Sequence, residues 1–224
     1  MTPQEYFGDW ANLIDFNELN NVLLELQKVS PELLCPSQNN VFRAFKLCSY
    51  KECKQVWVGM DPYSKKDVAT GILFGNNKET KEINLSPSLR VIKESCIDPE
   101  IPHKTIIFDN TLESWAKQGI LMLNSALTCI VNKTSSHMML WRKFIATFLK
   151  NLSLRDSGII YVLFGSQAQT FEPYINSKYN YIIKSHHPSY FARINKSMPH
   201  TIFTIIDKVL IDTYGQTVQW YTEY

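Results

Sequence analysis

The chain has 224 residues, a formal net charge of +2, and 45% hydrophobic residues. This length suits one α/β domain, and the apolar content excludes a disordered chain because it supplies a sizeable core. The small net charge neither requires nor excludes an anionic partner, since a local basic patch can lie on a near-neutral chain.

The first predicted element is an amphipathic helix. Asp15 is a suitable N-cap, and the apolar residues from Phe16 to Val29 recur on one helical face. Four short apolar runs follow later, each too short and too rich in β-branched or aromatic residues for a helix. They cover residues 55–60, 119–124, 158–165 and 181–185. Their near-continuous apolarity indicates strands buried on both faces, as in a parallel sheet.

Helix-like segments separate these runs. One covers residues 86–96, with Ser86 as N-cap and Pro87 in the first turn. Another begins at about His137, and the last covers residues 200–215 and ends at Gly215. The alternation predicts an α/β fold, a three-layer sandwich with a central four-stranded, mostly parallel sheet. Because there is no repeat, low-complexity tract or long linker, we expect residues 1–224 to form a single domain.

Polar residues stand at or just after the end of each predicted strand. They are Asp61 and Tyr63, Asn124, Ser166, and His187 with Ser189. In an open parallel sheet, ligands bind outside the carboxyl ends of the strands. We therefore expect an acid, an amide, a hydroxyl beside a helix N-terminus and a histidine to meet in one crevice. This pattern favours an enzyme that uses an Asp/His pair.

Each candidate also has a structural interpretation. Asp61 before Pro62 is typical of a turn, Asn124 suits a helix cap or a structural hydrogen bond, and Phe74 alone is more typical of a core residue. The coincidence of Asp, Asn and His at three strand ends favours function. The His186–His187 doublet has no accompanying metal motif, and the chain has no GxGxxG or GxxxxGK[ST] loop. We therefore expect no metal and no cofactor.

The cysteines indicate a reducing compartment. They are odd in number and scattered, without a CxxC pair: Cys35, Cys48, Cys53, Cys96 and Cys129. This usage favours free thiols over a disulfide framework or a zinc site. The N-terminus does not resemble a signal peptide, and no apolar run approaches membrane-spanning length. We expect a soluble intracellular protein with no membrane partner, in the cytoplasm or, for a eukaryotic or viral source, the nucleus.

Taken together, the segments resemble family 1 uracil-DNA glycosylases, of which the chain is identified as a divergent member. The segments that carry the resemblance are "GMDPYS" (59–64), "TGILFGN" (70–76), "SPSL" (86–89), "WAKQGILMLN" (115–124), "SSHMMLW" (135–141), "FGSQAQ" (164–169) and "HPSYFA" (187–192). Two further segments, "PSQNNVFRAF" (36–45) and "GQTVQW" (215–220), also look like family segments. The resemblance therefore extends over nearly the whole chain, and the joint order of the segments makes a chance match improbable.

The resemblance implies a DNA repair enzyme that flips uracil out of DNA and hydrolyses its N-glycosidic bond, leaving an abasic site. Asp61 would stabilise the oxocarbenium-like sugar and orient the attacking water. His187, as a neutral imidazole, would donate a hydrogen bond to uracil O2, where negative charge develops.

The resemblance also implies the residues that read the base. Asn124 would pair with the O4 and N3–H edge of uracil, and Phe74 would stack on the flipped ring. Tyr63 would stand against C5 and exclude thymine, whose methyl group would clash. The backbone N–H near Met60 would bind the base, a role that tolerates a change of side chain.

A further set of residues would contact DNA. It comprises Pro87, Ser88, Ser166, Ser189, Tyr190 and Phe191. The serines would hold phosphates through sequence-independent contacts. Phe191 would take the place of the leucine that fills the vacated base stack in the family, since aromatic wedges can intercalate.

The chain departs from the family pattern at several positions. Met60 replaces a glutamine and Ser64 a histidine, while Tyr190-Phe191 replaces Pro-Leu. These changes leave the rate and the preferred substrate open. Altered base choice, such as a 5-substituted uracil, is a further alternative that Tyr63 argues against.

The expected partner is uracil-containing DNA, single- or double-stranded, bound by a monomer. An alternative function is that of a DNA-binding accessory or processivity subunit in a replication complex, as in some poxviral relatives. Replication proteins or a proteinaceous uracil-DNA glycosylase inhibitor are partners that the sequence leaves open.

Overall fold

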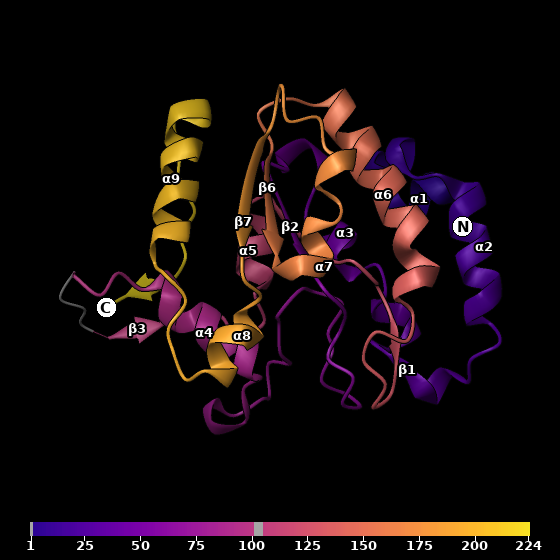
Figure 1. The fold of residues 1–224 in the computed structure, drawn as a ribbon, viewed down its shortest axis with the longest axis horizontal. Coiled ribbons are helices and arrows are strands. Elements are labelled where there is room, and N and C mark those ends of the chain that lie inside the picture. The colour runs from indigo at the N-terminus through magenta and orange to yellow at the C-terminus, as the bar shows by residue number, and fades with distance from the viewer. Residues whose placement is uncertain (1, 101–104) are drawn as a thin grey trace.

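A computed structural model describes residues 2–100 and 105–224 (Figure 1). Its main sheet has four strands in the order β4-β2-β6-β7, and every neighbouring pair is parallel. These strands are β2 (Gln55–Gly59), β4 (Ile120–Asn124), β6 (Ile160–Phe164) and β7 (Tyr181–Ser185). The predicted α/β fold with a central four-stranded parallel sheet is confirmed.

Helices and short strands surround this sheet. The α-helices are α1 (Pro3–Phe7), α2 (Phe16–Leu26), α3 (Arg43–Leu47), α4 (Pro87–Cys96), α5 (Glu113–Lys117), α6 (Met138–Arg155), α7 (Gly165–Gln169), α8 (Pro188–Arg193) and α9 (Thr201–Tyr214). Two antiparallel pairs of two-residue strands lie outside the sheet, namely β1 (Leu34–Cys35) with β5 (Cys129–Ile130) and β3 (Ile106–Ile107) with β8 (Thr222–Glu223). None of the helices in the described part of the chain is long and apolar enough to cross a membrane.

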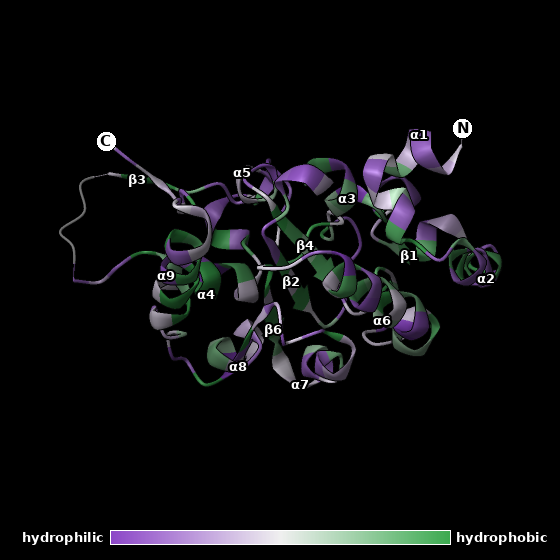
Figure 2. Ribbon diagram, turned by 90° about the horizontal axis from the view of Figure 1, so that it is seen from above, coloured by the Kyte–Doolittle hydropathy of each residue, from purple (hydrophilic) through white to green (hydrophobic). Residues whose placement is uncertain are grey.

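The two faces of the sheet bury two separate hydrophobic cores. Side chains alternate along a strand, so Val56 and Val58 of β2 pack in one core while Trp57 packs in the other. The first core includes α2 and α6, and the second includes α4 and α9. Helices therefore cover both faces, as Figures 1 and 2 show, and the apolar strands lie between them.

The edge strand β7 departs from the prediction of burial on both faces. The side chains of β2 and β6 are fully buried, whereas those of β7 are only partly covered, and Tyr181 is 43% exposed. The reason is its position at the edge of the sheet, because β6 is the one strand that pairs with β7 within residues 2–100 and 105–224.

The predicted helix ends hold with one exception. The Asp15 carboxylate accepts hydrogen bonds from the N–H groups of the first turn of α2, and Gly215 ends α9 with a left-handed φ of +68°. Ser86 does precede α4, but its side chain makes no cap. Its hydroxyl instead accepts a 2.8 Å hydrogen bond from Asn76 Nδ2. A local pattern cannot anticipate this partner, which comes from another loop.

A buried hydroxyl fixes the segment between β5 and α6. Thr128 Oγ1 accepts a 2.7 Å hydrogen bond from Trp141 Nε1 and lies 2.9 Å from His137 Nδ1. All three side chains are buried. The hydroxyl accepts from the indole N–H, and it also shares a hydrogen bond with Nδ1 whose direction depends on the tautomer of the imidazole.

We predict that Thr128→Val lowers the free energy of unfolding by about 1–3 kcal/mol, because it leaves a buried indole N–H and a buried imidazole nitrogen without partners. Urea unfolding followed by tryptophan fluorescence measures the loss. Thr128→Ser keeps the hydroxyl and is the matched control. Equal stability of the Val and Ser variants would contradict this role for the hydroxyl.

Candidate active site

The carboxyl ends of β2, β4 and β7 open into a cavity of about 680 Å³. They lie on the edge of the sheet that faces down in Figure 1, where α8 follows β7. The cavity is lined by most of the residues that the sequence predicted for the site: Met60, Asp61, Tyr63, Phe74, Pro87, Ser88, Asn124, His187 and Ser189. The predicted acid, amide and histidine therefore line one cavity, with residues from the loop after β2, from β4, from α4 and from the start of α8, whereas the predicted hydroxyl of Ser166 does not. Ser166, Tyr190 and Phe191 lie outside its wall.

Asp61 follows the end of β2 and is held by a backbone group. Its Oδ2 accepts a 2.6 Å hydrogen bond from the N–H of Ser135, whose φ is +62°. Burial raises the pKa of the Asp61 carboxyl above its ordinary value, and the bond from Ser135 opposes that shift. Sequence reasoning missed Ser135 as a partner, because a backbone donor can belong to any residue type.

His187 is the N-cap residue of α8. Its Nδ1 accepts a 3.2 Å hydrogen bond from the N–H of Ser189 and lies 2.9 Å from Ser189 Oγ. A nitrogen that accepts from a backbone N–H carries no proton, so the neutral ring carries its proton on Nε2. Burial, and then the charge of Arg193, lower the pKa of His187 to about 4. The imidazole is therefore neutral at physiological pH.

Two glycines permit the close approaches around these residues. Gly165 has a φ of +84°, and a Cβ there would lie 2.9 Å from the Cβ of His187. A Cβ on Gly59 would lie 2.2 Å from Leu73 Cδ1 and 3.1 Å from Asn124 Oδ1. The absence of a side chain at Gly59 therefore lets the Asn124 amide approach the backbone at the end of β2. The absence of a side chain at Gly165 lets His187 approach the backbone after β6.

Asn124 presents an unpartnered acceptor at the cavity. It is the last residue of β4 and pairs with Gly59 in the register of the sheet. Its Oδ1 is buried and has no hydrogen-bond partner among the residues that the structure describes. Leaving such a group unpaired costs about 1–3 kcal/mol, so a ligand that donates an N–H there gains an interaction that the free protein lacks.

Tyr63 and Phe74 form an aromatic wall. The Tyr63 hydroxyl donates a 3.0 Å hydrogen bond to the carbonyl of Phe74, whose φ of +64° is rare for a residue other than glycine. The Phe74 ring is 4% exposed, and its edge contacts join it to Phe164 at 5.3 Å and His187 at 5.4 Å between centroids. Phe74 thus belongs to the core and also lines the cavity. Burial raises the pKa of Tyr63, which keeps its hydroxyl protonated.

The predicted DNA-contacting residues occupy two settings. Pro87 and Ser88, in the first turn of α4, line the cavity, and Ser88 is buried. Ser166 in α7 and Tyr190 in α8 are exposed, whereas Phe191 is partly buried. The cavity wall also contains residues that were not predicted for the site, among them Ile83 and Thr134.

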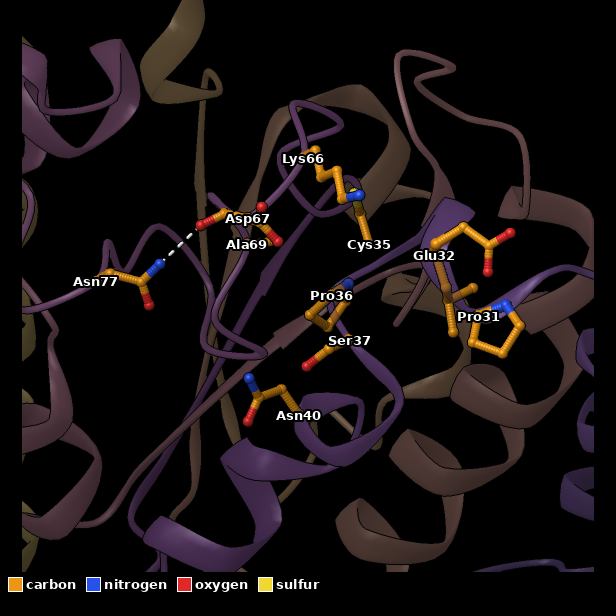
Figure 3. Close-up of a pocket in the computed structure, with 11 residues that line it drawn as sticks. Pro31, Glu32, Cys35, Pro36, Ser37, Asn40, Lys66, Asp67, Ala69 and Asn77 are labelled. Carbon is orange, nitrogen blue, oxygen red and sulfur yellow. Dashed lines mark hydrogen bonds between the residues drawn. The ribbon is translucent and has the colours of Figure 1, made fainter.

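A smaller cavity of about 300 Å³ is lined in part by Lys66, Asp67 and Ala69 (Figure 3). Its wall combines Glu32, Asn40 and Lys66, and Asn77 Nδ2 donates a 2.7 Å hydrogen bond to the Asp67 carbonyl. None of the predicted site residues lines it, so the predicted chemistry belongs to the larger cavity. Throughout residues 2–100 and 105–224, no three or more His, Cys, Asp or Glu side chains are arranged to hold a metal ion.

Comparison with known proteins agrees with this geometry. Residues 45–208 match the model of the uracil DNA glycosylase superfamily. The chain is 31% identical over 191 residues to a uracil-DNA glycosylase of Buchnera aphidicola, covering 85% of each chain. It is 35% identical over 194 residues to one of Campylobacter jejuni, covering 83% of this chain and 81% of that one.

Solved structures share the fold. A variant of the mimivirus enzyme UNG, crystallised in complex with UGI, superposes with a TM-score of 0.77 at 22% identity, covering 97% of this chain and 87% of that one. The family match extends over the strands and loops that build the cavity, from β2 to the loop after β7. The chain therefore belongs to the uracil DNA glycosylase superfamily.

Proposed function

We propose that the protein is a uracil-DNA glycosylase of base excision repair, which hydrolyses the bond between uracil and deoxyribose and leaves an abasic site. The observation that carries this proposal is the unpartnered Asn124 Oδ1 in a cavity that also holds Asp61 and a neutral His187. Residues 1–224 act in it as one domain and as a monomer. The substrate is uracil in single- or double-stranded DNA, flipped out of the stack where it is paired.

Breaking the bond places positive charge on the sugar and negative charge on the base. Asp61 stabilises the sugar cation and orients the water that attacks C1′, then accepts a proton from it. The N–H of Ser135 holds the carboxylate in position through one oxygen and leaves the other for the water. Carboxylate burial strengthens its interaction with the cation, because the surroundings screen charge poorly.

His187 stabilises the departing base. Its Nε2–H, fixed by the bonds of Ser189 to Nδ1, donates to uracil O2 as negative charge develops there. A preorganised donor of this kind contributes about 3 kcal/mol to transition-state stabilisation. The neutral ring suits the role because it needs no change of protonation before the reaction.

Recognition of the base uses the cavity wall. Asn124 accepts from N3–H through Oδ1 and donates to O4 through Nδ2, whereas cytosine presents the opposite order of donor and acceptor. Phe74 stacks on the ring, and Tyr63 stands against C5. The backbone N–H of Met60 supplies a further donor. A mismatched base leaves these buried groups unpaired, at a cost of about 1–3 kcal/mol each.

The DNA backbone is held around the cavity. Pro87 and Ser88 of α4, Ser166 of α7 and Ser189 of α8 contact phosphates, while Tyr190 and Phe191 meet the base stack. An inhibitor protein would compete for the same face, a proposal supported by the mimivirus UNG variant of the same fold that was solved in complex with UGI.

We predict that the purified protein releases uracil from a uracil-containing oligonucleotide, detected as strand cleavage after alkali treatment, and leaves thymine and cytosine. Asp61→Asn removes the general base and lowers kcat by about a hundredfold or more. His187→Ala lowers it by roughly 10²–10³-fold through loss of one donor. Asp67→Asn, an exposed acid on the same loop outside the cavity, is the matched control. Full activity in the Asp61→Asn, His187→Ala double variant would exclude the assigned roles.

The pH dependence of kcat/KM reports both groups. Because the pKa of His187 is about 4, we expect no step near the ordinary histidine value of 6.5. On the acid side, activity falls as Asp61 is protonated, and this occurs above the ordinary value of 3.8 because burial raises its pKa. Steady-state rates across the acid and neutral range measure the profile. A step near 6.5 that disappears in His187→Ala would contradict the neutral, buried imidazole.

Tyr63 tests the specificity proposal. Tyr63→Ala removes the ring that stands against C5, so we expect measurable release of thymine and a several-fold loss of uracil release. Tyr63→Phe keeps the ring and continues to exclude thymine, although it loses the hydrogen bond to the Phe74 carbonyl, worth about 1 kcal/mol of stability. A competition assay with uracil and thymine oligonucleotides compares the variants. If the Tyr63→Ala and Tyr63→Phe variants both release thymine, or if neither does, the proposed steric exclusion of thymine by the Tyr63 ring is refuted.

A further inference from the structure

Two cysteines face each other beside the loop that carries Asp61. Cys35 of β1 and Cys129 of β5 are directly paired in the antiparallel register, and both are buried free thiols. Residues opposite each other in such a pair have Cα atoms about 4.5–5.5 Å apart, which lies within the range that a disulfide spans. The register of these two short strands therefore gives the pair the separation that a disulfide needs.

Both thiols donate hydrogen bonds to carbonyl groups of the Asp61 loop. Cys129 Sγ lies 3.5 Å from the carbonyl oxygen of Pro62. Cys35 Sγ lies 3.6 Å from the carbonyl oxygen of Ser64 and 3.9 Å from that of Lys65. All three acceptor residues line the larger cavity, and Pro62 directly follows the proposed catalytic carboxylate. The two S–H groups therefore help to position the loop.

The smaller cavity gives access to one of the two sulfurs. Cys35 lines it together with Lys66, whose side chain is directed toward Cys35 in Figure 3. Burial, and then the charge of Asp67, raise the pKa of Cys35, whereas the hydrogen bond with Cys129 and the charge of Lys66 oppose the rise. Burial, and then the charge of Asp61, raise the pKa of Cys129 to about 12. Because the thiolate is the reactive form, Cys35 is the sulfur suited to react first.

We propose that Cys35 and Cys129 form a reversible disulfide under oxidation by a small hydroperoxide, and that this disulfide slows uracil excision by loosening the loop that carries Asp61. The inference rests on the proposed glycosylase function and goes beyond it by adding a modification site. Neither cysteine belongs to the wall of the larger cavity, so both are positioning residues that act through the loop.

The reaction consumes one hydroperoxide molecule for each pair of thiols. The Cys35 thiolate attacks one peroxide oxygen, the O–O bond breaks, and the leaving oxygen takes up a proton, while Cys35 becomes a sulfenic acid. Cys129 then loses its proton and attacks the Cys35 sulfur, so that the S–S bond forms, the S–O bond breaks and water leaves. The two thiols give up two electrons, and the peroxide takes up the same two. A dithiol reductant restores both thiols by exchange.

The disulfide removes the donors that hold the loop. A disulfide sulfur carries no proton, so the carbonyl groups of Pro62, Ser64 and Lys65 lose their hydrogen bonds from sulfur. The Ser64 carbonyl still accepts a 2.8 Å hydrogen bond from the N–H of Asn132, which keeps one attachment of the loop in place. Asp61 is then held less precisely, and a displacement of about 1 Å at a reacting group costs on the order of a hundredfold in rate.

The first experiment compares uracil release before and after treatment with hydrogen peroxide, with and without later reduction by dithiothreitol. The wild type is expected to lose roughly tenfold in kcat on oxidation and to recover it on reduction. Cys35→Ser and Cys129→Ser cannot form the bond, so each is expected to keep its own untreated rate. Cys53→Ser, which removes a partly exposed thiol shortly before β2, is the matched control and is expected to respond like the wild type.

The second experiment follows the bond and the loop without using activity. Peptide mapping under non-reducing conditions, after alkylation of the remaining thiols, is expected to join the peptide that contains Cys35 to the one that contains Cys129. Trypsin is expected to cleave after the exposed Lys65 and Lys66 several-fold faster in the oxidised protein than in the reduced one. Oxidation should leave this cleavage rate unchanged in Cys35→Ser.

The outcomes separate the inference from the function on which it rests. A map in which oxidation joins Cys48 to Cys53 and leaves Cys35 unlinked would overturn the assignment. A Cys35–Cys129 disulfide that changes neither kcat nor the cleavage rate of the loop would overturn its proposed effect. Fully reduced wild-type protein that releases no uracil would instead refute the proposed function. In that case the peptide map and the proteolysis rate would still decide whether the disulfide forms and loosens the loop.

Discussion

The parallel register of the central sheet is the constraint on which the site depends. Because all four strands run in one direction, their carboxyl ends lie on one edge of the sheet. Asn124 ends β4 at that edge, and the loops that carry Asp61 and His187 leave from it. Pairing of Gly59 with Asn124 brings two of these strand ends together. A hydrophobic core packs against each face of the sheet, so the residues at these strand ends are held by rigid elements.

Burial sets the electrostatics of both reactive groups, and it acts on them in opposite directions. It raises the pKa of Asp61 and lowers that of His187, because in each case it disfavours the charged form. The histidine is therefore held neutral, as a donor to the base requires. The carboxylate keeps its charge at neutral pH with the help of a backbone N–H from Ser135.

The cavity contains several residues whose conformation or lack of a hydrogen bond destabilises the folded protein. Asn124 leaves a buried amide oxygen unpaired, and both Phe74 and Ser135 adopt a left-handed backbone. Residues held in such conformations persist because the surrounding structure over-determines them, here through the Tyr63 hydroxyl on the Phe74 carbonyl. These features lower the stability of the free protein, and in return the polar groups of the site are already in position before the substrate binds.

Local pattern determined the strands, the helix limits at Asp15 and Gly215, and the group of residues at the strand ends, because burial periodicity and capping depend on neighbours in sequence. The order of motifs also identified the family. Tertiary structure alone decided that Ser135 holds Asp61, that Ser86 bonds Asn76 instead of capping α4, and that Tyr190 is exposed while the partly buried Phe191 packs against the core. Each of these depends on contacts between segments distant in sequence, and such contacts leave no periodic signal in either segment.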